Sequence, residues 1–82
     1  MYLHVGNYKN IREKSIIGIF DTDNATVSPI TRKFLNDSQK KGVLSSAGDD
    51  IPKSFVLYEE ENEIKVCFSQ LSSASLRGRI GK

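Results

Sequence analysis

The stretch SFVLYEEENEIKVCFS, residues 54–69, decides the fold class of this chain. Two runs rich in β-branched and aromatic residues flank the acidic segment EEEN. Runs of this length on either side of a short polar segment predict an antiparallel β-hairpin. We therefore expect strands at residues 54–59 and 63–69, with an acidic turn between them.

The segment before this hairpin predicts three further short strands. Residues 2–5 end at Gly6-Asn7, a dipeptide typical of turns, and residues 10–14 are expected to return beside them. Residues 16–20, IIGIF, form an apolar run that is too short for a helix and rich in β-branched residues. We expect this run to be a central strand, buried on both faces.

Residues 28–42 carry the signals of a helix at both ends. Ser28 is a good N-cap, Pro29 suits the first helical position, and Gly42 is a common stop. At helical periodicity, the apolar and basic side chains fall on opposite sides. The apolar stripe is Ile30, Phe34 and Leu35, and the opposite side carries Arg32, Lys33, Asn36 and Lys40. This helix should pack on the sheet, and residues 43–44 should begin another short strand.

These elements predict a single α+β domain over residues 1–82, with a small, mainly antiparallel sheet and one long helix. Residues 71–82 are expected to form either a short C-terminal helix or a mobile basic tail. A chain of 82 residues buries only about 60–65% of its unfolded surface, so subunit contacts are a common way to extend its core. We expect a homo-oligomer.

Composition argues against export and membrane insertion. The only cysteine, Cys67, lies within the apolar run IKVCF and fits a buried side chain in a reducing cytosol. The N-terminus lacks a signal-peptide pattern, and no apolar run is long enough to cross a membrane. A cytoplasmic location without membrane contact is the expectation.

The sequence offers weak support for catalysis or for a cofactor. DTDNAT, residues 21–26, lacks the glycine and the closing glutamate of a calcium loop, so a capped turn is expected there. The single histidine, His4, fits a structural or interface role, and no serine has a nucleophile-elbow setting. Asp49 and Asp50 are adjacent and are most simply the solvated residues of a turn. We expect no catalytic residue, metal ion or cofactor.

The basic side chains suggest that the protein binds a polyanion, although its net charge is only +2, from 12 basic and 10 acidic residues. On one monomer these cations form a thin footprint, which is more often a solvated surface. In an oligomer they repeat as a belt, and such a belt can hold a long polyanion through many phosphate contacts without base readout. The belt comprises Lys9, Arg12, Lys14, Arg32, Lys33, Lys40, Lys53, Arg77 and Arg79.

Several segments resemble a known family. These segments, which cover nearly the whole chain, are HVGNYKNIREKSIIGIFD, TRKFL, KKGVL, DDIPKSFVL and FSQLSSASL. They are similar to the B-type members of the Rem family, regulators of extracellular matrix genes in Bacillus-like Gram-positive bacteria. The resemblance implies a cytoplasmic DNA-binding regulator of biofilm matrix production that assembles into rings around which DNA bends.

The loop before residue 54 departs from the A-type relatives. Those relatives carry an arginine-rich DNA-binding loop there, whereas this chain has Asp49, Asp50, Ile51 and Pro52, and only Lys53 is basic. Two acids repel phosphate, so contact with double-stranded DNA must depend on other cations. We predict Lys14, Arg32, Lys33, Lys53, Arg77 and Arg79 as the nucleic-acid-binding residues. The alternative is a protein-interaction module that binds an acidic partner or a Rem paralogue.

Overall fold

A computed structural model describes residues 1–6, 9–47 and 51–80. Asp49 and Asp50, the acids of the predicted turn, lie outside these residues. The elements are, in chain order, β1 (Tyr2–Gly6), β2 (Lys9–Arg12), the 3-10 helix η1 (Glu13–Ser15), β3 (Ile16–Asp21), α1 (Thr22–Ala25), α2 (Pro29–Lys41), β4 (Leu44–Ala47), β5 (Ser54–Glu60), β6 (Glu63–Ser69) and α3 (Ser73–Arg79). The predicted α+β class is confirmed.

The strands form two sheets. β1 and β2 make an antiparallel ribbon, and the other strands form a sheet in the order β3-β5-β6-β4. β5 and β6 pair in register from Ser54 opposite Ser69 to Glu60 opposite Glu63, which confirms the predicted hairpin. β4 runs parallel to β6, and the other pairs are antiparallel.

The expectation that residues 16–20 form a central strand is wrong. Among the residues that the structure describes, β3 pairs only with β5, so it is an edge of the four-stranded sheet. Ile19 is buried, but Ile17 is 56% exposed and Phe20 is 40% exposed. The run is apolar on both faces because one face packs in the core and the other borders an open groove.

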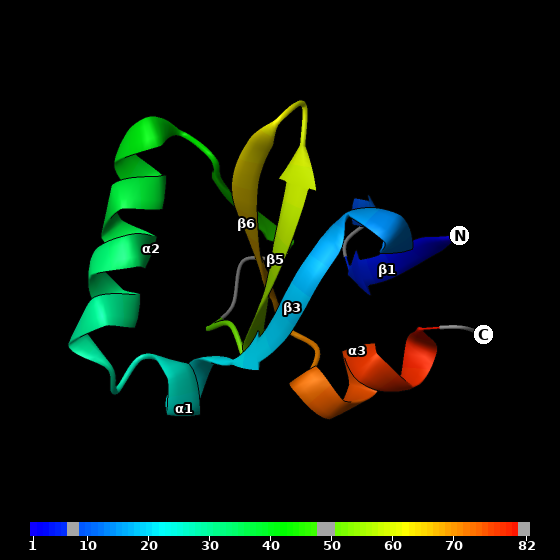
Figure 1. Ribbon diagram of the computed structural model, residues 1–82. Helices are drawn as coiled ribbons and strands as arrows, with labels where there is room; N and C mark the ends of the chain where they lie inside the picture. Colours follow the sequence, from blue (N-terminus) through cyan, green and yellow to red (C-terminus); the bar gives the residue numbers. More distant parts are fainter. Residues whose placement is uncertain (7–8, 48–50, 81–82) are drawn as a thin grey trace.

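The two faces of the four-stranded sheet are covered differently (Figure 1). We call the side that packs against the β1–β2 ribbon and α3 the closed face. Its core includes Leu3, Val5, Val56, Cys67 and Leu76, each at most 1% exposed. We call the other side the open face, because α2 packs there mainly against β4 and β6 and leaves an apolar groove toward β3. Its core is smaller and consists of Leu35, Phe55 and Val66.

The helix ends follow from local sequence. Ser28 caps α2 by accepting a hydrogen bond from the Thr31 N–H at 3.5 Å, and Pro29 begins the helix. Gly42 ends it with φ of 77°, a left-handed conformation that glycine adopts without strain. At the C-terminus, the structure shows a helix rather than a tail for Ser73–Arg79. In the described part of the chain, no helix is long and apolar enough to span a membrane.

Candidate nucleic-acid interface

The three predicted arginines all donate hydrogen bonds to backbone carbonyl groups. Arg32 Nη1 lies 2.8 Å from the Thr26 oxygen, and Arg77 Nη2 lies 2.6 Å from the Ile19 oxygen. Arg79 Nη1 lies 3.3 Å from the His4 oxygen. A guanidinium group has further N–H donors, so each anchored arginine still presents positive charge and donors to solvent. These arginines therefore tie elements together and remain able to meet a phosphate.

The three predicted lysines differ in whether their side chains form an ion pair. Lys33 Nζ lies 3.6 Å from Asp37 Oδ2 in an exposed pair one helical turn apart. Within the described residues, the exposed Lys14 and Lys53 side chains make no ion pair or hydrogen bond. The Lys53 backbone is fixed, because its N–H donates to Ser69 and its carbonyl accepts from Thr22. Lys14 and Lys53 are thus the cations best placed to gain a new partner.

The predicted cations are not gathered on one surface of the monomer. Lys14 precedes β3, whereas Lys53 bonds to Thr22 just after β3, so the two are separated by about 20 Å of strand. Arg32 and Lys33 lie on α2, and Arg77 and Arg79 lie on α3, at opposite sides of the molecule (Figure 1). Arg32, Lys53 and Arg77 nevertheless approach the α1 region, since Arg32 bonds to Thr26 and the other two border pockets that include Asp21. The six cations therefore do not form one continuous patch on a single copy.

The β1–β2 ribbon presents a second polar surface, which was missed in the sequence. Tyr2 pairs with Arg12 and His4 pairs with Asn10, so these four side chains share one face of the ribbon. All four are exposed, whereas Leu3, Val5 and Ile11 on the other face are buried. We call these four residues the ribbon face. The alternation of buried and exposed residues in YLHV and NIR was the signal that could have revealed it.

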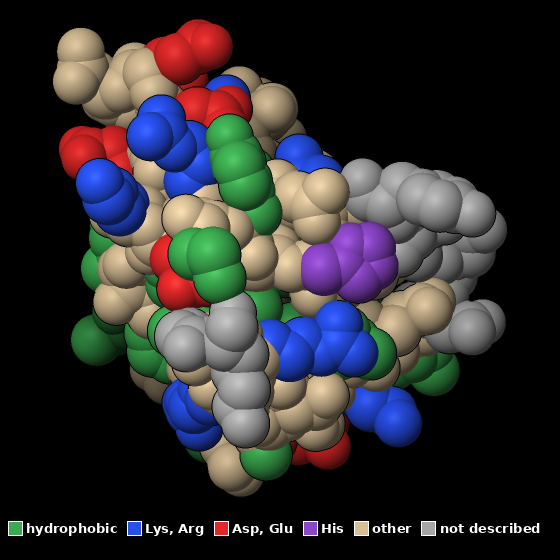
Figure 2. Space-filling view, turned by 90° about the vertical axis from the view of Figure 1, so that its right-hand side faces the viewer, with side chains coloured by type: hydrophobic (Ala, Val, Ile, Leu, Met, Phe, Trp, Pro, Cys, Tyr) green, Lys and Arg blue, Asp and Glu red, His purple; other side chains and the backbone are tan. Residues whose placement is uncertain are grey.

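The surroundings of the ribbon face are basic. Arg79 reaches it from α3 through its bond to the His4 carbonyl, and His4 Nδ1 lies 3.1 Å from Asn10 Oδ1. Figure 2 shows the histidine side chain at the surface with blue Lys and Arg side chains beside it. None of the four ribbon-face residues is acidic. This surface therefore combines amide, imidazole, phenol and guanidinium groups.

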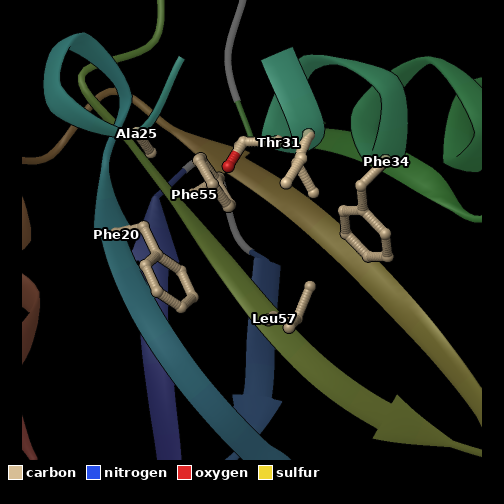
Figure 3. Close-up of a pocket in the computed structure, with 7 residues that line it drawn as sticks. Phe20, Ala25, Thr31, Phe34, Phe55 and Leu57 are labelled. Atoms are coloured by element: carbon tan, nitrogen blue, oxygen red, sulfur yellow. The ribbon is translucent and has the colours of Figure 1, made fainter. Parts of the chain in front are cut away.

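An apolar groove lies on the open face, between α2 and the β3–β5 edge (Figure 3). Its volume is about 300 Å³, and its lining is Phe20, Ala25, Phe55 and Leu57 on one side and Ile30, Thr31 and Phe34 on the other. The Phe20 and Phe55 rings stack with centroids 5.3 Å apart. The groove remains open because α2 lies closest to β4 and β6 and leaves Phe20 of β3 partly exposed.

Two other titratable groups, Cys67 and Lys65, have pKa values shifted by their surroundings. Burial raises the pKa of the Cys67 thiol, which keeps it protonated at neutral pH. The hydrogen bond from Lys65 to Glu60 raises the pKa of that ammonium group. Across residues 1–6, 9–47 and 51–80, no three His, Cys, Asp or Glu side chains group in a way that could hold a metal ion.

The structure thus defines a small α+β domain with cationic and amide groups on its exterior and an apolar groove on one face. The chain is 37% identical over 79 residues to extracellular matrix regulatory protein B of Bacillus subtilis (strain 168). The match covers 96% of this chain and 89% of the relative, so the chain belongs to the family of extracellular matrix regulatory protein B. This confirms the resemblance seen in the sequence. No protein-family model matches the chain.

Proposed function

We propose that this protein is a cytoplasmic regulator of extracellular matrix genes that binds double-stranded DNA as a homo-oligomeric ring. The observation that carries the proposal is the match, over nearly the whole chain, to a relative named as an extracellular matrix regulatory protein. The proposal assigns the chain a role in binding and not in catalysis.

Phosphate contacts supply the affinity in this proposal. Lys14 and Lys53 are exposed cations without a described partner, and Arg32, Arg77 and Arg79 keep free N–H groups beyond their backbone bonds. Lys33 is held only by an exposed pair, which contributes little and is easily exchanged for a phosphate. Because these cations lie around the fold, a ring presents each of them repeatedly along a bent duplex.

A second copy of the chain is the proposed occupant of the apolar groove. The surface area of 5530 Å² exceeds the value of about 4,900 Å² typical of a folded monomer of this size. Part of the excess is apolar, because Ile30 is 82% exposed at the groove and Ile17 is 56% exposed on the adjacent edge strand. A groove that receives a different surface of the next copy makes a head-to-tail contact, and such contacts can close into rings.

The alternative function is a protein-interaction module, and the groove is the observation that favours it. An apolar groove of about 300 Å³ beside an unpaired strand edge can also receive a paralogue or another partner protein. In that case the cations serve solubility or an acidic partner rather than DNA.

Salt-dependent DNA binding separates the two functions. We expect fluorescence anisotropy with a long labelled duplex to show binding at 50 mM salt. Six phosphate contacts should weaken this binding by about a thousandfold at 200 mM. Lys53→Ala should weaken binding, whereas the Asp49→Asn and Asp50→Asn double variant should strengthen it at low salt.

Lys65→Ala is the matched control, because the Lys65 ammonium is already paired with Glu60 at 3.0 Å. Its DNA affinity should equal that of the wild type. Absence of binding at 50 mM salt, or an equal effect of Lys53→Ala and Lys65→Ala, would favour the interaction module instead.

A further inference from the structure

We propose that the β1–β2 ribbon reads base edges in the DNA major groove through Tyr2, His4, Asn10 and Arg12. This inference rests on the proposed function and extends it, because phosphate contacts alone carry no sequence information. The Arg12 guanidinium group can form two hydrogen bonds to guanine, and the Asn10 amide can form two hydrogen bonds to adenine.

The shape of the ribbon suits this task. The major groove, about 12 Å wide, admits a two-stranded β-ribbon, and the strands of such a ribbon lie about 4.8 Å apart. All four reading side chains lie on one exposed face, opposite the buried Leu3, Val5 and Ile11. The ribbon can therefore present this face to DNA without disturbing the core beneath it.

The ribbon is held rigidly, which base reading requires. Ser69 Oγ donates to the Val5 carbonyl at 2.7 Å, and Arg79 donates to the His4 carbonyl at 3.3 Å. Asn10 Oδ1 faces His4 Nδ1 at 3.1 Å, which leaves the Asn10 NH₂ group and one Oδ1 lone pair for a base. The Asn10 side chain, which His4 already contacts, loses less conformational freedom on binding than an unattached side chain, so its hydrogen bonds to a base contribute more to discrimination.

The register of the ribbon predicts the spacing of the bases read. The Tyr2–Arg12 pair and the His4–Asn10 pair are two residues apart along each strand, a distance of about 7 Å. Because base pairs rise by about 3.4 Å, the two side-chain pairs reach base pairs two steps apart. The preferred motif should therefore contain a guanine read by Arg12 and an adenine read by Asn10, with one base pair between them.

Selection of bound duplexes from a random-sequence pool tests the inference. The wild-type protein should enrich a short motif with two fixed positions at this spacing. Arg12→Ala should flatten the preference at one position by about 5- to 150-fold, the equivalent of about 1–3 kcal/mol, and Asn10→Ala should flatten the other. Both variants should keep most of their low-salt affinity for unrelated DNA.

Lys14→Ala is the matched comparison, since it removes the same charge two residues from Arg12 and off the ribbon face. It should weaken binding to all sequences alike and leave the motif intact. Far-ultraviolet circular dichroism and thermal unfolding of each variant should match the wild type, because Asn10 and Arg12 are exposed.

Two outcomes would overturn the inference in different ways. Salt-sensitive binding without any enriched motif, or a motif that survives Arg12→Ala, would leave the DNA-binding function standing and remove the reading role of the ribbon. Absence of binding to any duplex at low salt would remove the proposed function and the inference with it.

Discussion

The closed and open faces of the four-stranded sheet differ in how completely they are covered. On the closed face, Val56 and Leu76 have no exposed surface, because the β1–β2 ribbon and α3 pack there together. On the open face, Phe34 is 38% exposed and Ile30 is 82% exposed, because α2 packs mainly along β4 and β6. The same sheet thus has one well-covered face and one face that keeps exposed apolar side chains.

This difference in coverage indicates that the two faces contribute differently to monomer stability and to assembly. Apolar area removed from water contributes about 25 cal/mol per Å², so the closed face stabilises the monomer. The uncovered apolar area of the open face contributes nothing until another chain covers it. We infer that the stability of the monomer depends mainly on the closed face, which has the larger core, and that assembly depends on the open face.

Leu76→Ala should give the largest effect, since it creates a cavity in the closed-face core. We expect the free energy of unfolding to fall by about 2–5 kcal/mol in urea denaturation followed by circular dichroism. Ile30→Ala on the open face is the matched truncation and should cost about 0.5 kcal/mol or less at high dilution. Equal losses of unfolding free energy for the two variants would contradict the proposed difference between the faces.

Ser69→Ala should give the next largest effect. Ser69 is 1% exposed, donates to the Val5 carbonyl at 2.7 Å and accepts from the Leu71 N–H at 3.1 Å. Its removal leaves two backbone groups without these partners, so we expect a loss of about 1–3 kcal/mol in the same assay. The exposed Ser75→Ala should change stability by no more than about 0.5 kcal/mol. A neutral Ser69→Ala would show that this bond does not hold the ribbon.

Two glycines, one beside each face, should respond to alanine with opposite signs. Gly42 ends α2 with φ of 77° in open space, so Gly42→Ala should cost about 1–2 kcal/mol through backbone strain alone. Gly78 lies within α3, lacks a positive φ and has no crowding neighbour in the described part of the chain, so Gly78→Ala should stabilise by about 0.5–1 kcal/mol. Thermal unfolding of the pair checks both signs, and a shared sign would contradict the assigned backbone conformations.

The sequence predicted those elements whose signals are local. The hairpin of residues 54–69 and the helix from Ser28 to Gly42 follow from residue alternation and from end caps, which depend on near neighbours. The position of β3 was not predictable in this way, because IIGIF is equally apolar in a central strand and in an edge strand beside a groove. Strand order depends on distant pairing that periodicity does not report.

The candidate interface was predicted in residue type but not in arrangement. Arg77 and Arg79 donate to carbonyl groups 58 and 75 positions away in the chain, and nothing in the local sequence indicates such bonds. The ribbon face was recoverable, because Tyr2 and His4 alternate with buried residues and Asn10 and Arg12 do the same. Asn10 is uncharged, so the distribution of charged residues does not reveal it.

Sedimentation velocity of the wild-type protein beside Ile30→Glu is the most direct test of the division between the two faces. At micromolar concentration we expect a wild-type assembly larger than a monomer, and a folded monomer for Ile30→Glu, because a charge at the groove opposes its burial. Ile30→Leu, which keeps the apolar side chain, should assemble as the wild type does. A wild-type protein that sediments as a strict monomer, or an Ile30→Glu variant that assembles unchanged, would contradict the claim that the open face is the assembly surface.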